Sequence, residues 1–235
     1  MLFFYIRHGD PIYEPDSLTP LGEKQADAIA KRLARYGVDK IYSSTSNRAI
    51  LTAKPTCELT RKKAELLDFC NENYAYEDFT IEKDGQKRWI FHDKEMKLLL
   101  TDKSVTDLGF NWYEHERLTQ FKKGMDRVFS ESYEFFLSLG YEHIRNTGRY
   151  KIHKHNNERV ALFAHQGFGL AFLSTVLDIP YPMFVNHFDT THTGLTVIEF
   201  GNEDGYSIPK VLTLSNDAHL YGDGLPTKYN NALYF

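Results

Sequence analysis

The sequence predicts an α/β fold, a three-layer α/β/α sandwich with a mostly parallel central sheet and a largely helical insertion that caps one edge of the sheet. Short apolar runs alternate with helical patterns over residues 1–70 and again after residue 157, which is typical of consecutive β–α–β units. Between these regions the alternation stops and aromatic residues are frequent. We therefore expect one domain over residues 1–235, with an insertion at residues 73–157.

The first part of the chain predicts three strands and two helices. Leu2–Ile6 is a continuous apolar run, as expected of a strand buried on both faces. Pro20–Tyr36 predicts a helix, because Thr19 is a suitable N-cap, proline is favoured in the first turn and Gly37 suits the exit. The apolar stripe of this helix consists of Ala26, Ile29, Ala30 and Leu33. The next elements are expected at Lys40–Ser43 (strand), Thr45–Leu59 (helix) and Ala64–Cys70 (strand).

The second part predicts two helices and the remaining strands. Glu114–Leu139 has apolar residues at helical spacing, and Gly167–Leu177 is apolar on nearly all sides, like a buried helix. Arg159–Ala164 predicts a buried strand, and two closing strands are expected at Thr193–Phe200 and Ser207–Leu214.

Composition and charge exclude several classes of protein. Apolar residues make up 42% of the chain and the net charge is −4, so we expect a globular core and no general affinity for nucleic acid or an anionic membrane. The early apolar run is too short for a membrane span or a signal peptide. Cys57 and Cys70 form neither a disulfide framework nor a zinc motif, so a cytoplasmic location is expected.

Polar side chains stand directly after four of the predicted strands. Arg7 and His8 follow the first strand, Arg48 the second, Glu72 the third, and His165 the strand after the insertion. Because ligands of open α/β sheets bind at the carboxyl ends of the strands, we expect these side chains to meet at one edge. Arg48 is the most informative, since the helix dipole disfavours a cation in a first turn. Taken singly, Glu72 would also fit a solvated loop carboxylate, and His165 would also fit a hydrogen-bonded histidine in the core.

Four blocks of sequence, in order, carry a resemblance to a known family. They are Arg7-His8-Gly9; Leu18-Thr19-Pro20-Leu21-Gly22 with Gln25-Ala26; Tyr42-Ser43-Ser44 with Arg48-Ala49 and Thr52-Ala53; and Phe163-Ala164-His165-Gln166-Gly167. These blocks resemble those of the histidine phosphatase superfamily, which has the phosphoglycerate mutase-like fold. The resemblance extends from residue 1 to about residue 200.

The resemblance implies a phosphomonoester hydrolase that acts on a small phosphorylated molecule through a phosphohistidine. His8 would be the nucleophile, and the phosphate would be held by Arg7, Arg48, His165 and Gln166, although Gln166 stands where glycine is common. Glu72 best matches the general acid of the family. Asp68 and Glu65 stay open for that role, because residues 71–79 depart from the usual glycine–tryptophan pattern. Another departure is Glu14, where many relatives place a phosphate-binding asparagine.

These residue types suit phosphoryl transfer without a metal ion or other cofactor. Arginine forms bidentate, charge-assisted bonds to phosphoryl oxygens, and arginine and histidine cations take the place that Mg²⁺ would occupy. His8 must attack as a neutral imidazole whose second ring nitrogen donates to a backbone carbonyl. A protonated His165 and the backbone N–H groups near Gly167 would add donors for the phosphate. Glu72 would protonate the leaving alcohol and then activate water.

Two other activities fit the same residues. A mutase would return the phosphoryl group to a second substrate oxygen, although the short tail 217–235 offers little to close the site. A catalytically silent module would bind phosphorylated ligands without turnover, but such a module needs no nucleophile like His8. The physiological substrate and the oligomeric state are not predicted.

Other motifs suggest functions that we consider weaker. Gly167-Phe168-Gly169 opens a helix after a strand, but the third glycine of a dinucleotide-binding fingerprint is missing. The histidines that could suggest a metal lack a recognised ligand spacing, so a structural or surface role is preferred for His153, His155, His187 and His192. A second anionic group of the substrate could be reached by Arg88, Arg117, Arg145 or Arg149, each of which also suits a plain surface position.

Overall fold

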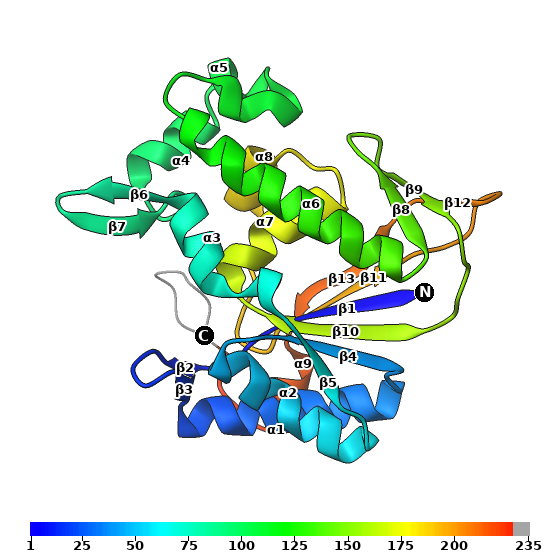
Figure 1. Ribbon diagram of the computed structural model, residues 1–235. Helices are drawn as coiled ribbons and strands as arrows, with labels where there is room; N and C mark the ends of the chain where they lie inside the picture. Colours follow the sequence, from blue (N-terminus) through cyan, green and yellow to red (C-terminus); the bar gives the residue numbers. More distant parts are fainter. Residues whose placement is uncertain (228–235) are drawn as a thin grey trace.

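The computed structural model describes residues 1–227 and shows a six-stranded sheet between two helical layers (Figure 1). In spatial order the strands are β13 (Lys210–Asn216), β11 (Leu195–Glu199), β1 (Leu2–Arg7), β10 (Arg159–Ala164), β4 (Lys40–Ser44) and β5 (Ala64–Leu67). β1, β10, β4 and β5 run parallel, and β11 is antiparallel to both of its neighbours. The predicted α/β/α class with a mostly parallel sheet is confirmed.

The apolar run at the start of the chain forms the middle of this sheet because both of its faces are covered. Phe3 and Tyr5 belong to the larger hydrophobic cluster on one side, whereas Phe4 and Ile6 belong to the cluster on the other side. Successive strand residues point to opposite faces, so a continuous apolar run is the pattern of a fully buried strand. His8 therefore has a well-fixed backbone position, because it directly follows a strand that is paired with a neighbour on each side.

One face of the sheet is covered by α1 (Pro20–Tyr36), α2 (Asn47–Thr60) and α9 (Ala218–Gly222), as Figure 1 shows. The predicted N-cap of α1 is confirmed, because Thr19 Oγ1 accepts a 3.0 Å hydrogen bond from the N–H of Gly22. Gly37 ends α1 at φ +78°, a backbone conformation that glycine adopts without strain.

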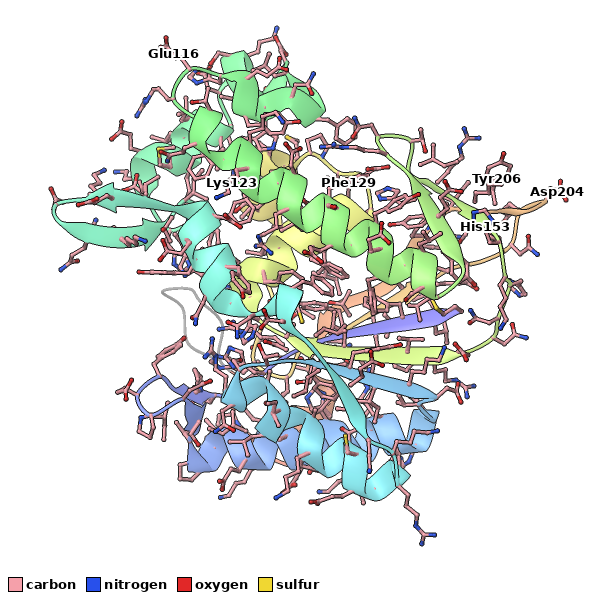
Figure 2. All side chains as sticks on the ribbon, viewed as in Figure 1. Glu116, Lys123, Phe129, His153, Asp204 and Tyr206 are labelled. Atoms are coloured by element: carbon pink, nitrogen blue, oxygen red, sulfur yellow. The ribbon has the colours of Figure 1, made fainter. Side chains whose placement is uncertain are left out.

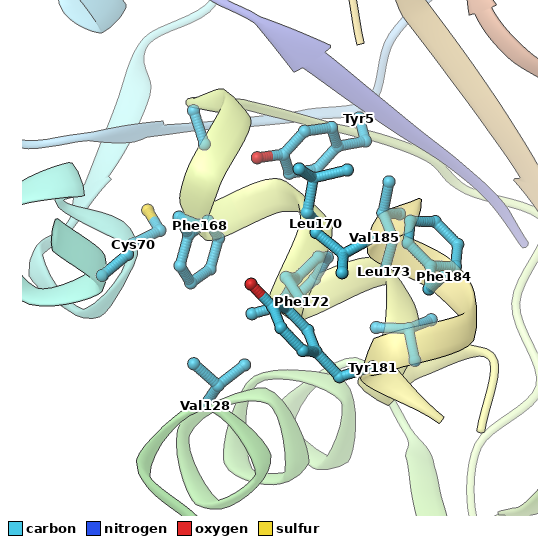
Figure 3. Close-up of a cluster of buried hydrophobic side chains, with 14 of the residues drawn as sticks. Tyr5, Cys70, Val128, Phe168, Leu170, Phe172, Leu173, Tyr181, Phe184 and Val185 are labelled. Atoms are coloured by element: carbon cyan, nitrogen blue, oxygen red, sulfur yellow. The ribbon is translucent and has the colours of Figure 1, made fainter. Parts of the chain in front are cut away.

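The other face is covered by α6 (Lys122–Ser138) and α7 (Gln166–Val176), with α8 (Tyr181–His187) packed against α7. Every residue of α7 is buried, which explains its lack of a polar face. Figure 3 shows Phe168 and Phe172 of α7 together with Tyr5 and Tyr181, which pack against this helix. The first turn of α7 is thereby held between the sheet and the insertion.

The predicted insertion holds short helices, short strands and the long helix α6. In chain order they are α3 (Glu72–Phe79), β6 (Thr80–Lys83), β7 (Gln86–Trp89), α4 (Lys94–Leu100), α5 (Lys103–Thr106), the 3-10 helices η2 (Gly109–Glu114) and η3 (Thr119–Phe121), α6, β8 (Tyr141–Ile144) and β9 (Arg149–Ile152). α6 lies on the sheet, where the Phe136 ring is 5.2 Å from the Phe3 ring. The boundaries 73–157 stay a prediction. Outside this stretch, short pieces are β2 (Pro11–Ile12), β3 (Ser17–Leu18), η1 (Asp68–Cys70) and β12 (Tyr206–Ser207).

Three predicted elements were wrong in their bounds. The long helix begins at Lys122 instead of Glu114, because extended His115 turns the chain and lets the rings of Trp112 and Phe121 stack in the core at 5.8 Å. The last closing strand is split into β12 and β13 around Pro209, which lacks a backbone N–H donor. The third strand ends at Leu67, and η1 replaces its final residues.

Two features of the described chain bear on its class. Cys57 and Cys70 are both free thiols, as the sequence predicted. Over residues 1–227, none of the helices combines the length and the apolar character needed to cross a membrane. The final residues of the predicted tail 217–235 lie outside the described part of the chain.

Candidate active site

The carboxyl edge of the parallel strands opens into a cavity of about 770 Å³. Its lining includes Arg7, His8, Arg48, Glu72 and Gln166, which come from β1, α2, α3 and α7. His165 is fully buried beside them, with its ring centre 5.2 Å from that of His8. The structure thus brings together all of the side chains that the sequence placed at one edge.

His8 has a defined tautomer. Its Nδ1 lies 2.7 Å from the carbonyl oxygen of Gly9 and donates to it, which leaves the lone pair on Nε2. Burial lowers the pKa of His8 well below its usual value, and His165 and the guanidinium groups of Arg7 and Arg48 act in the same direction. A neutral imidazole with a free Nε2 is the form that a nucleophilic attack requires.

His165 is held through Nε2, whereas His8 is held through Nδ1. Nε2 lies 2.8 Å from Ser44 Oγ and 3.1 Å from Ser46 Oγ, and the Tyr5 hydroxyl donates to the His165 carbonyl at 2.6 Å. Burial lowers the pKa of His165 well below its usual value, followed by the charges of Arg48 and Arg7. A phosphate dianion beside the ring would act in the opposite sense and favour the protonated form.

The two arginines are buried and anchored by different partners. Arg7 Nη1 donates to the Thr190 carbonyl at 2.6 Å. Arg48 Nη1 donates to Asp16 Oδ1 at 2.8 Å, and the other carboxylate oxygen of Asp16 accepts the N–H of Asn47 at 2.7 Å. Asp16 therefore stabilises both the start of α2 and the cation that stands there against the helix dipole.

Glu72 caps the N-terminus of α7. Its Oε1 accepts the N–H of Gly167 at 2.9 Å and its Oε2 accepts the N–H of Phe168 at 3.1 Å. The expectation that these N–H groups bind the phosphate was wrong, since the carboxylate uses both of them. Burial raises the pKa of Glu72, and the two N–H groups, Arg48 and Arg7 oppose the increase.

The other carboxylates considered for the acid lie elsewhere. Asp68 and Glu65 are exposed and do not line the cavity. Asp68 accepts hydrogen bonds from Tyr74 and Thr45, and these bonds lower its pKa. Glu14 is exposed in the turn between β2 and β3 and is also absent from the lining.

The alternative motifs are explained by packing. At Gly167 a Cβ atom would stand 2.6 Å from Cζ3 of Trp89, and at Gly169 it would stand 2.7 Å from Cζ of Tyr5. The two glycines thus allow aromatic side chains to approach the start of α7. The arginines proposed for a second anion do not line the cavity; the partners are Asp84 for Arg88, Glu95 for Arg117, Asp126 for Arg145 and the Tyr206 ring for Arg149.

The histidines proposed for a metal do not gather. Within residues 1–227 the acidic, histidine and cysteine side chains form no cluster that could hold a metal ion. His153 lies at the β8–β9 end of the molecule (Figure 2), where its Nε2 is 2.6 Å from Glu142. His192 is half-buried near the site: its ring centre is 5.7 Å from that of His8, and its Nδ1 is 3.4 Å from Asp10 Oδ1.

The sequence did not indicate several residues around the site. Asp16, Trp89 and His92 line the cavity, and Asp189 accepts a hydrogen bond from Gln166. None of them belongs to a local motif, because each reaches the site from a loop or from the insertion. The serines that hold His165 carried a weak signal, a run of hydroxyl side chains after the second strand.

The fold and this site define the class of the protein. The chain belongs to the histidine phosphatase superfamily (branch 1), whose family model matches residues 4–135. The predicted resemblance is confirmed. No curated protein matches the sequence.

Solved structures show the same fold. The phosphoserine phosphatase of Entamoeba histolytica in complex with phosphoserine has a TM-score of 0.61 at 17% identity and covers 93% of this chain and 98% of its own. Bacillus stearothermophilus YhfR has a TM-score of 0.60 at 19% identity, with 93% and 98% covered. A mycobacterial glucosyl-3-phosphoglycerate phosphatase has a TM-score of 0.57 at 18% identity, with 91% and 98% covered.

Proposed function

We propose that the protein is a phosphomonoester hydrolase that forms a phosphohistidine on Nε2 of His8. The observation that carries the proposal is the bond from His8 Nδ1 to the Gly9 carbonyl, which leaves Nε2 unprotonated beside two buried arginines. Membership of the histidine phosphatase superfamily supports a small phosphorylated substrate, as do two structural relatives, a phosphoserine phosphatase and a glucosyl-3-phosphoglycerate phosphatase.

The first step forms the phosphohistidine. Nε2 of His8 attacks the phosphorus atom, the bond from phosphorus to the ester oxygen breaks, and Glu72 gives its proton to the leaving alcohol. The guanidinium groups of Arg7 and Arg48 stabilise the charge on the phosphoryl oxygens, and His165 contributes a further donor. The Gly9 carbonyl keeps its bond to Nδ1–H while the ring becomes positively charged.

The second step releases phosphate. The Glu72 carboxylate takes a proton from water, the water oxygen attacks phosphorus, and the bond between phosphorus and Nε2 breaks. His8 returns to its neutral form and Glu72 to its protonated form. The raised pKa of Glu72 suits this exchange, because the group must lose and regain a proton in each cycle.

The test is the chemical nature of the intermediate. Acid-quenched protein should carry a phosphoryl group that is labile in acid and stable in alkali, and His8→Ala should lower turnover by about 10⁴-fold or more. His153→Ala, an exposed histidine outside the cavity, is the matched control and should keep its activity. An acid-stable adduct would refute the assignment of His8.

A phosphate-release assay with and without a bisphosphate primer, read together with the adduct measurement, separates the two alternatives. A mutase would require a bisphosphate primer and would transfer the phosphoryl group between substrate oxygens without net release of phosphate. A silent binding module would bind phosphate esters and form no adduct.

A further inference from the structure

The cavity beyond the phosphate-binding residues has a wall of neutral side chains. Tyr13, Tyr76 and Trp89 contribute aromatic rings, and Asn71 and Asn73 contribute amide groups. These groups offer ring faces, hydroxyl groups, and amide donors and acceptors to a ligand.

Among the described residues, the positively charged side chains of the cavity lie next to His8, at what we call its floor. Of the described residues that line it, Arg7 and Arg48 are the only lysine or arginine side chains, and both stand next to His8. Burial lowers the pKa of His92, which also lines the cavity, and the charge of Lys97 acts in the same direction. Asp16 also lines the cavity, but its carboxylate is paired with Arg48. Among the described lining residues, a ligand carboxylate placed away from Arg7 and Arg48 would therefore meet no lysine or arginine side chain.

The aromatic groups come from three separate segments of the chain. Tyr13 lies between β2 and β3, is 69% exposed and has its ring centre 5.6 Å from the Arg48 guanidinium carbon. Tyr76 on α3 and Trp89 at the end of β7 form an edge-to-face pair with ring centres 5.3 Å apart. Figure 1 shows the β2–β3 segment and the β6–β7 hairpin on opposite faces of the sheet, both extending past the same edge of it.

We infer that the ester cleaved in this cavity is the phosphate of a neutral, hydroxylated ring, which is the shared chemistry of sugars and nucleosides. The inference rests on the proposed function. The ring would contact the aromatic wall, and its hydroxyl groups would bind amides such as that of exposed Asn73. Acidic esters of similar size would leave their carboxylate without a partner.

A neighbouring hollow provides the structural alternative. This hollow, of about 250 Å³, shares His92 with the cavity and contains Lys97. If a longer acidic substrate reached across His92, its carboxylate would meet the Lys97 ammonium group. Lys97→Ala therefore distinguishes the two substrate classes.

The experiment compares kcat/KM for phosphate release from five probes. Glucose 6-phosphate and adenosine 5′-monophosphate represent the ring esters, phosphoserine and 3-phosphoglycerate the acidic esters, and p-nitrophenyl phosphate is an activated reference. The acidic probes are chosen because structural relatives hold them. We expect at least one ring ester to exceed both acidic esters by about ten-fold, the effect of one missing charge-assisted bond. The better ring ester identifies the sugar or the nucleoside as the ligand.

Variants then locate the contact. Tyr13→Ala and Asn73→Ala should lower kcat/KM for the ring ester about five-fold more than for ethyl phosphate, which has no ring. Lys97→Ala should leave all rates within about two-fold of the wild type. A preference for the acidic esters, or their selective loss in Lys97→Ala, overturns this inference while the proposed function stands. Failure to release phosphate from any probe, including p-nitrophenyl phosphate, overturns the proposed function and the inference with it.

Discussion

Replacing Glu72 with glutamine tests the general acid and the helix cap in a single variant. Both carboxylate oxygens of Glu72 accept backbone N–H groups, at 2.9 Å from Gly167 and 3.1 Å from Phe168. Glutamine keeps one acceptor and turns an NH₂ group toward the second N–H. A buried donor left without a partner costs about 1–3 kcal/mol, so we expect the free energy of unfolding to fall by about this amount.

The loss of activity should depend on the leaving group. Glutamine has no proton to give, and general acid catalysis contributes about 10²- to 10⁴-fold. An alkyl phosphate, whose alcohol must be protonated, should therefore lose about 10²-fold or more in kcat. An aryl phosphate leaves as a stable phenolate and should lose about ten-fold or less, through the disturbed start of α7.

The assay measures kcat for an alkyl and an aryl phosphate, together with urea unfolding followed by circular dichroism. Asp68→Asn and Glu65→Gln are matched controls, because both carboxylates are exposed outside the cavity. They should change kcat less than about two-fold and stability less than about 0.5 kcal/mol. Equal losses on both substrates in Glu72→Gln, or a leaving-group effect in Asp68→Asn, would refute the assignment.

Three further predictions follow from the site. Because burial holds the pKa of His8 and His165 well below the usual value of 6.5, unfolding takes up protons below about pH 6.5. As pH drops from 7.5 to 5, the unfolding free energy of the wild type should thus fall relative to that of the His8→Gln/His165→Gln double variant. The fall should reach up to about 1.4 kcal/mol per pH unit for each histidine. A difference between the two proteins that does not change with pH would contradict this prediction. Gly167→Ala should lower stability by about 1–3 kcal/mol in thermal unfolding, because its methyl group would overlap the Trp89 ring and stand 2.6 Å from Cζ3. Gly201→Ala meets open space and should be nearly neutral. Dialysis against EDTA should leave phosphate release within about two-fold, since arginine and histidine cations supply the charge at the phosphate in the proposed mechanism; a loss restored by Mg²⁺ or Zn²⁺ would show the reverse.

Much of the site could be predicted from local rules. His8, Arg48 and His165 each follow a buried strand, and the carboxyl ends of parallel strands share one edge, so their meeting follows from strand order and direction. The helix α1 was predicted with its cap and its end because Thr19, Pro20 and Gly37 act within a few residues of one another.

The sequence by itself therefore determined the α/β class, the strands of the parallel sheet and the residues at their ends, because periodicity and capping are short-range properties. The tertiary structure alone decided that Glu72 rather than Asp68 enters the cavity, that Asp16 pairs with Arg48, and that Trp89 lies against Gly167. Each of these contacts joins segments separated by loops or by the insertion. Their geometry depends on how the layers pack, and no local pattern of residues encodes that packing.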